Sequence, residues 1–92
     1  MIPLVTDARF TRSHHEDQVR GLLGWTSFVI GGAILVDGVA VRRTRDGALS
    51  LSFPEPTDAR GKRHVPIRPL DQDARRMIEQ QVLRQLGLET TP

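Results

Sequence analysis

Six basic residues in the second half of the chain are the side chains best suited to chemistry, and that chemistry is phosphate binding. They are Arg60, Lys62, Arg63, Arg68, Arg75 and Arg76. The planar guanidinium group of arginine fits a phosphate with two parallel hydrogen bonds. Residues 60–68 carry four of these cations and no carboxylate, and Gly61 among them allows close backbone approach to a ligand. The six residues form the predicted nucleic-acid-binding site.

Arg75 and Arg76 lie near the start of a predicted helix, where free backbone N–H groups favour an anion. Together with the loop they would make one continuous basic patch. The alternative is that they pair with Asp71, Asp73 or Glu79 at helical spacing. The separate alternative for the loop is a solvated surface with ordinary charge.

The charge is unevenly distributed along the chain. The formal net charge is +2. Residues 42–84 hold ten basic and six acidic side chains, net +4, whereas residues 1–41 are net −1. Twelve of the 13 basic residues are arginine, which suits nucleic acid but can also reflect genomic base composition. We interpret Arg42, Arg43 and Arg45, around a predicted hairpin tip, as charges that keep the hairpin soluble.

Other chemistries find little support in the sequence. The chain has no cysteine, so it has no disulfide and no thiolate. The run from His14 to Asp17 is interpreted as a polar loop, because adjacent histidines on an extended chain point in opposite directions and no second ligand pair follows. No serine lies in a catalytic motif and no glycine-rich lysine loop is present. We expect no enzyme activity, no metal and no cofactor.

Three aromatic residues, Trp25, Phe28 and Phe53, invite comparison with the base-stacking side chains of sheets that bind single strands. They are not interleaved with basic residues. We therefore predict that all three pack in the core.

Hydrophobic patterning predicts the elements that must position these residues. Strands are expected over residues 3–10, 21–30 and 33–41, with a turn at Gly31-Gly32. The continuous centre of the third strand, residues 34–36, is expected to be well covered on at least one face. A fourth strand follows the Asp46-Gly47 turn, where Leu49 and Leu51 alternate with serines.

The rest of the chain is a loop and a helix. Residues 12–18 and 54–63 are expected to be polar loops, and residues 65–67 a short edge strand limited by prolines. A helix is predicted to begin after Asp71 as N-cap and to end at Gly87. Its apolar stripe is formed by Ala74, Ile78, Val82 and Leu86.

The predicted fold class is α+β: a small antiparallel β-sheet of four to five strands, built from hairpins, followed by one C-terminal amphipathic helix. Residues 1–87 form a single domain and residues 88–92 a flexible tail. The uncharged stretch at residues 21–36 contains four glycines and is shorter than the roughly 20 residues of a membrane span. We therefore expect no membrane contact and a cytoplasmic location. A cysteine-free domain this small gains stability by oligomerising, and we expect a homodimer that buries part of the sheet at residues 21–41 or the helix stripe.

An ordered series of residues resembles the sporulation stage V protein G (SpoVG) family of septation regulators over residues 4–86. The first strand resembles the family's opening strand through residues 5–10, and Asp46-Gly47 with Phe53-Pro54 resembles its glycine turn and Met-Pro step. The later matches are Gly61, Val65, Pro69-Leu70, Arg75, Ile78 and Val82-Leu83. The family's Lys-Arg pair after Met-Pro is replaced here by residues 55–57, and a helix lysine by Met77.

The resemblance implies a dimeric antiparallel sheet with a C-terminal helix in a bacterial cytoplasmic protein. It also implies a role in cell division, septation and sporulation through DNA or RNA binding. The alternative function is a protein-interaction module that recruits a partner through a sheet edge or the helix. The two differ in salt dependence, because phosphate contacts weaken steeply as salt rises.

Overall fold

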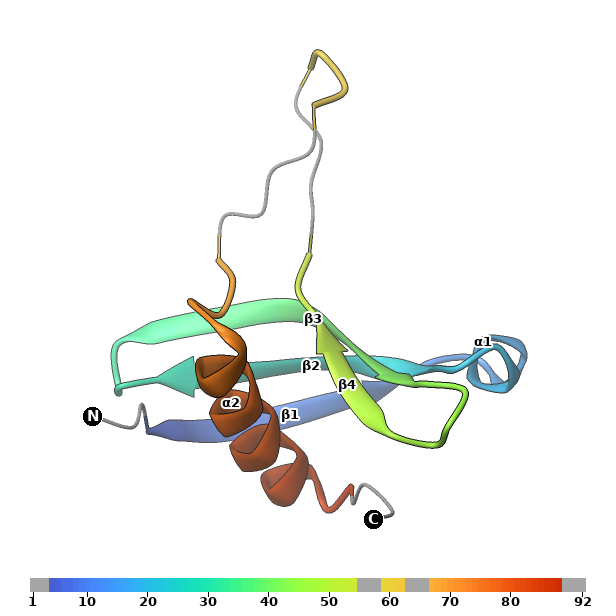
Figure 1. The fold of residues 1–92 in the computed structure, drawn as a ribbon, viewed down its shortest axis with the longest axis horizontal. Helices are drawn as coiled ribbons and strands as arrows, with labels where there is room; N and C mark the ends of the chain where they lie inside the picture. The colour runs from blue at the N-terminus through green and yellow to red at the C-terminus, as the bar shows by residue number, and fades with distance from the viewer. Residues whose placement is uncertain (1–3, 55–58, 63–66, 89–92) are drawn as a thin grey trace.

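The computed structural model describes residues 4–54, 59–62 and 67–88, and these form a four-stranded antiparallel sheet crossed by a C-terminal helix (Figure 1). The elements in order are β1 (Val5–Arg12), α1 (His15–Val19), β2 (Leu22–Ile30), β3 (Ile34–Arg43), β4 (Leu49–Ser52) and α2 (Gln72–Leu86). Each strand pairs with the next one along the chain, in the order β1-β2-β3-β4. The α+β class predicted from the sequence is confirmed.

Two predicted segments differ from the structure. Residues 12–18, predicted as a loop, include most of the one-turn helix α1, which ends at Val19. This helix is held by the side-chain amide of Gln18, which donates to the Ser13 carbonyl at 2.9 Å. Of the predicted edge strand at residues 65–67, only Ile67 is described, and it lies in a bend rather than a strand. The described part of the sheet therefore has four strands.

Helix α2 begins and ends where the sequence predicts. The carboxylate of Asp71 accepts a 2.8 Å hydrogen bond from the Ala74 backbone N–H, which satisfies one of the open N–H groups of the first turn. Gly87 ends the helix in the left-handed region at φ 72°, a conformation that costs glycine little. Beyond it, Leu88 was assigned to the tail but packs against the core; residues 89–92 lie outside the described residues.

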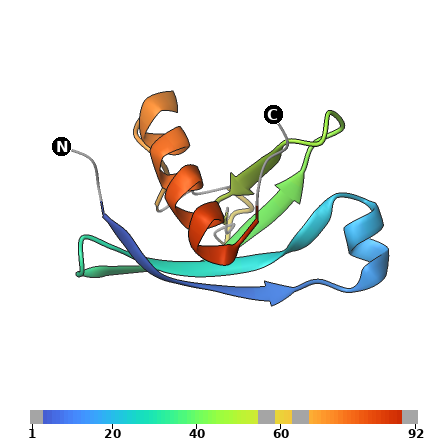
Figure 2. The same ribbon diagram turned by 90° about the horizontal axis from the view of Figure 1, so that it is seen from below.

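The core lies between α2 and one face of the curved sheet (Figure 2). Phe28 is fully buried and meets Phe53 edge to face, with ring centroids 6.5 Å apart. Both aromatic residues were predicted in the core, and both lie there. Within residues 34–36, the apolar centre of β3, Val36 is buried, whereas Ile34 and Leu35 are 54% and 64% exposed. The cover expected on at least one face of that segment is therefore found at Val36 and does not extend to Ile34 or Leu35.

Helix α2 also satisfies one edge of the sheet through its glutamine side chains. The backbone N–H of Val5 donates to Oε1 of Gln81 at 2.8 Å, and the Val5 carbonyl accepts from Nε2 of Gln85 at 2.5 Å. Oε1 of Gln85 in turn accepts from the Ala8 backbone N–H at 3.2 Å. An edge strand carries unpaired backbone groups that invite another strand. Here side chains of α2 form hydrogen bonds with those backbone groups at the start of β1.

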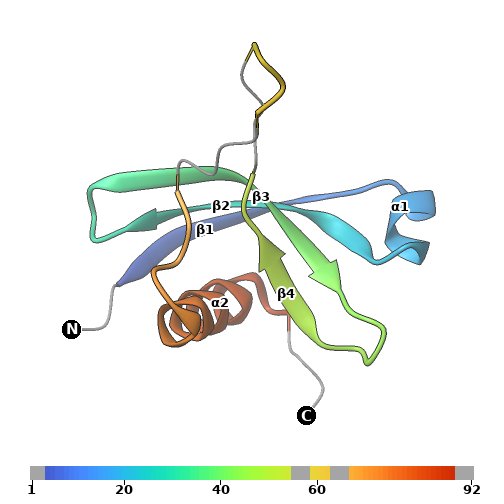
Figure 3. The same cartoon turned by 45° about the horizontal axis from the view of Figure 1, so that its top comes forward.

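At the opposite edge of the sheet, two charged side chains of α2 bond to the backbone of β4 in the same way. Oε2 of Glu79 accepts from the Leu51 backbone N–H, and Nη1 of Arg75 donates to the Leu51 carbonyl, both at 2.7 Å. The two side chains lie 3.7 Å apart, so they form an ion pair as well. Helix α2 thus connects β1 to β4 across the concave face of the sheet (Figures 2 and 3).

The other face of the sheet carries no described element (Figure 2). No helix within residues 4–54, 59–62 and 67–88 is long and apolar enough to cross a membrane.

Candidate nucleic-acid interface

The predicted basic site is divided between two places that lie apart. Arg60 and Lys62 are exposed at the tip of the segment that leads from β4 to α2, and this tip projects away from the sheet and the helix (Figures 1 and 3). Arg68 is also exposed and precedes α2. Arg63 lies outside the described residues. The tip does not join the helix start, so the continuous patch expected from the sequence is absent from the described residues.

Arg75 is part of the framework of the fold rather than an open phosphate ligand. Its guanidinium group binds the Leu51 carbonyl and lies beside Glu79. The pairing with Glu79 was the alternative that helical spacing suggested. Arg76, the next residue, is exposed.

Substitutions at Arg75 and Arg76 distinguish an arginine that stabilises the fold from one that is only exposed on the surface. We expect Arg75→Ala to lower the free energy of unfolding by about 1 kcal/mol, because a part-buried backbone carbonyl loses its donor. Arg76→Ala removes the same charge one residue away and is expected to change stability by less than about 0.5 kcal/mol. Urea denaturation followed by tryptophan fluorescence measures both. Equal stability of the two variants would contradict the structural role of Arg75.

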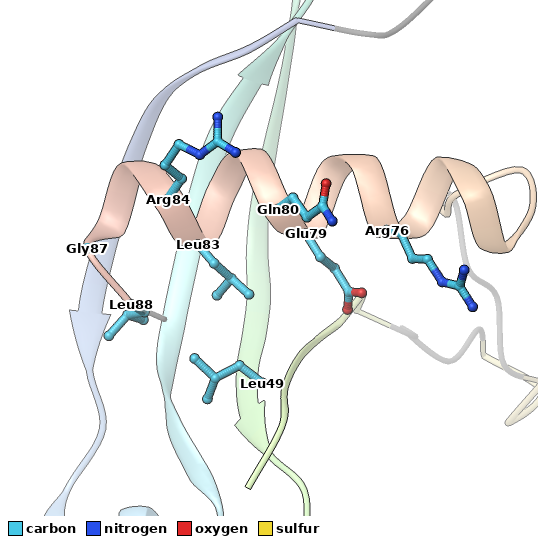
Figure 4. A pocket seen from close by; sticks show the side chains of 8 residues that line it. All are labelled: Leu49, Arg76, Glu79, Gln80, Leu83, Arg84, Gly87 and Leu88. Carbon is cyan, nitrogen blue, oxygen red and sulfur yellow. The ribbon is translucent and has the colours of Figure 1, made fainter. Parts of the chain in front are cut away.

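A groove of about 480 Å³ lies between β4 and the stretch of α2 from Arg76 to Arg84 (Figure 4). Its apolar lining comes from Leu49, Leu83 and Leu88. Arg76 and Arg84 lie at opposite ends of this stretch of helix and do not converge on one point (Figure 4). The Glu79 carboxylate in the groove is already bonded to Leu51. The groove therefore does not present a site for an anion.

A second basic surface lies at the end of the sheet that holds α1 and the β3–β4 hairpin (Figure 1), where the hairpin arginines were predicted only to keep the hairpin soluble. We call it the arginine end. Its members are Arg12, Arg20, Arg42, Arg43 and Arg45. All five are exposed, and within the described part of the chain none has a carboxylate within 4.0 Å.

Strand pairing brings these arginines together from distant positions. Arg12 is opposite Gly24, which is opposite Val41, so the end of β1 lies level with the end of β3. The Arg43 backbone N–H donates to the Gly21 carbonyl at 2.7 Å, which places Arg20 beside β3. The sequence signal was present only as three separate groups of arginines, and no local pattern linked them.

Three carboxylates share this end of the molecule: Glu16 and Asp17 on α1 and Asp46 in the hairpin turn. The Asp46 carboxylate is engaged within its own turn. The Thr44 hydroxyl donates to it, and this hydrogen bond lowers the pKa of Asp46, helped by the backbone N–H groups of Asp46 and Ala48. Asp46 thus supports the turn and leaves Arg43 and Arg45 without a partner in the described residues.

The histidines and the serine that could suggest metal binding or catalysis lie at or beside α1. His14 is the N-cap residue of α1 and His15 its first residue. Within residues 4–54, 59–62 and 67–88, no group of three or more histidines and carboxylates could hold a metal ion. The Ser13 hydroxyl donates to the Leu22 carbonyl at 2.5 Å, so it holds α1 against β2.

Trp25 is the aromatic residue for which the prediction of core packing is wrong. It is 39% exposed and lies on the uncovered face of the sheet. The buried side chain next to it is Thr26, whose hydroxyl donates to the Arg9 carbonyl at 2.7 Å. Alternation along β2 explains this, because burial of Phe28 also turns Thr26 and Gly24 inward and Trp25 outward.

Comparison of the sequence with protein-family models and with curated proteins finds no match. The geometry described above is therefore the basis for any functional assignment.

Proposed function

We propose that this protein is a nucleic-acid-binding regulator that holds DNA or RNA mainly through its phosphates. The observation that carries the proposal is the arginine end. Five arginines from separate segments gather there, exposed and without carboxylate partners in the described residues. A cluster of this kind neutralises phosphates and releases counterions, which gives affinity without reading base sequence. Arg60, Lys62 and Arg68 extend the basic character to the projecting segment.

The SpoVG resemblance adds a cellular role to this proposal. It suggests a cytoplasmic bacterial regulator of septation and sporulation. The fold class agrees with that family's sheet and C-terminal helix, although many unrelated functions share such a fold. We propose no enzymatic activity and no cofactor.

Fluorescence anisotropy with short labelled DNA and RNA at two ionic strengths tests the proposal. We expect binding at low salt that falls by orders of magnitude at moderate salt, because each neutralised phosphate adds to the salt dependence. A protein that fails to bind either nucleic acid at low salt would contradict the proposed function.

A second candidate, a protein-interaction module, is favoured by the free edge of β3. β4 pairs only with residues 40–43 of β3, so among the residues that the structure describes no strand lies beside residues 34–39 on that side. Ile34 and Leu35 there are more than half exposed. The edges at Val5 and Leu51 are occupied by α2, and the helix stripe is buried in the core. Strand addition is therefore available along β3.

The simplest occupant of the β3 edge is a second copy of this chain, and we propose a homodimer formed there. Antiparallel pairing of two identical edges is self-complementary, as a two-fold interface requires. The helix stripe, the other surface considered for the dimer, is already used within the monomer.

The dimer is checked by light scattering at micromolar concentration. We expect twice the monomer mass for the natural chain and the monomer mass for Leu35→Lys, because a charge on the edge opposes strand pairing. Thr6→Lys, a charge on the far strand, is the control and is expected to stay dimeric. If the natural chain is monomeric throughout, the proposed homodimer is wrong and the β3 edge remains available to a different protein.

A further inference from the structure

The open face of the sheet has a continuous row of side chains across all four strands. Thr11 of β1 is opposite Trp25 of β2, Trp25 is opposite Ala40 of β3, and Ala40 is opposite Ser52 of β4. Directly opposed residues have Cβ atoms about 5 Å apart. The direct neighbours of the indole ring along this row are therefore Thr11 and Ala40, with Ser52 one strand further, and all three side chains are small enough to leave the face of the ring accessible.

Two arginines lie on the same face on opposite sides of Trp25. Arg9 is two residues from Thr11 on β1 and is opposite Ser27, whereas Arg42 is two residues from Ala40 on β3 and is opposite Ser50. Residues two apart on a strand share a face and lie about 7 Å apart. Both arginines are exposed, and neither has a carboxylate partner in the described residues.

We propose that this open face binds single-stranded nucleic acid, with one base stacked on the Trp25 indole and the neighbouring phosphates held by Arg9 and Arg42. The inference rests on the proposed nucleic-acid binding and specifies its ligand and its site. An aromatic ring between cations is the arrangement with which sheets bind single strands, because every base has a face to stack and every nucleotide a phosphate. Arg42 also belongs to the arginine end, so the strand continues from Trp25 onto that surface.

The composition of the face favours a single strand over the other occupants. A duplex keeps its bases stacked on one another, so it offers Trp25 no free base face. A second copy placed face to face would bring the arginines of both copies together, and like charges at an interface oppose association. Thr11 and Ser27 beside the ring, and Ser50 and Ser52 further along the same face, are hydroxyl residues, which pair with phosphates and bases rather than forming an apolar interface core.

The proposed pairing of two copies along β3 is compatible with single-strand binding on the open face. Two strands that pair antiparallel are related by a two-fold axis perpendicular to the sheet. Pairing along β3 would therefore turn both open faces to the same side and place two Trp25 rings on one extended surface.

Trp25 is the only tryptophan in the chain, so its fluorescence reports directly on stacking. The probes are a ten-nucleotide oligo-dT, the equivalent oligo-rU and a ten-base-pair duplex. We expect saturable quenching by both single strands and little quenching by the duplex. In anisotropy, Trp25→Ala is expected to weaken single-strand binding about tenfold or more, and Trp25→Phe to keep most of the affinity. Arg9→Gln is expected to weaken it several-fold, and Gln80→Ala, on the far side of the sheet, is the control.

The outcomes separate this inference from the proposed function. Single strands that bind in a salt-dependent way without quenching, and equally well to Trp25→Ala, would overturn the stacking site while leaving phosphate binding intact. Absence of binding by any probe at low salt would overturn both. If Trp25→Ala turns a dimer into a monomer and no probe quenches Trp25, the face is a protein interface and the inference is wrong. Quenching of the natural chain and the behaviour of Trp25→Phe decide the matter even if Trp25→Ala does not fold.

Discussion

Gly24→Ala is expected to destabilise the protein by about 3 kcal/mol or more, at the upper end of the cost of overfilling a packed core. Gly24 is buried in β2, and a Cβ atom there would lie 2.7 Å from Cζ of Phe10 and closer still to the Thr11 carbonyl oxygen. The Phe10 ring packs directly on the bare glycine backbone. A backbone oxygen cannot move aside without breaking the pairing of β1 with β2.

The control for this change is Gly32→Ala. Gly32 has φ +66° but nothing within 4 Å of its added Cβ, so only the left-handed backbone conformation is penalised, at about 1 kcal/mol. Small domains have about 5–15 kcal/mol of stability in total, so the Gly24 variant loses a large share of it. Thermal unfolding by circular dichroism compares the two. Similar melting temperatures would show that β1 and β2 do not approach each other closely at Gly24.

Neutralising the arginine end is expected to have the largest effect on binding. A variant with Arg42, Arg43 and Arg45 changed to Gln should lose most of its affinity for a single strand. Each phosphate contact contributes about 0.7 to the slope of log affinity against log salt, so three lost contacts lower the slope by about 2. Anisotropy titrations between about 50 and 200 mM salt measure that slope.

Two further variants locate the interface within the molecule. Arg60→Gln with Lys62→Gln tests the projecting segment that the sequence analysis favoured, and we expect a smaller change in slope there. Arg84→Gln, on the outer side of α2 (Figure 4), controls for overall charge. A full loss of affinity in the Arg60 and Lys62 variant, with none in the triple variant, would contradict the arginine end as the main contact.

The sequence by itself determined the local features of the fold. Asp71 and Gly87 set the limits of α2 because capping depends on a few adjacent residues. Gly31-Gly32 and Gly47 turn the chain with positive φ, as glycine allows. Alternation of Leu49 and Leu51 with serine gave the buried face of β4. These features are decided by neighbours in sequence, so they could be predicted residue by residue.

Only the tertiary structure decided which faces and residues remain available for function. Nothing local tells which side of β2 the helix covers, so Trp25 was predicted to be buried, whereas packing leaves Trp25 exposed and buries Thr26 beside it. The sequence suggested that Arg75 binds phosphate, but in the structure its guanidinium group donates to the Leu51 carbonyl on the edge of β4. Arg12, Arg20 and Arg42 came to the same end of the sheet through strand pairing, a long-range property that spacing along the chain does not encode.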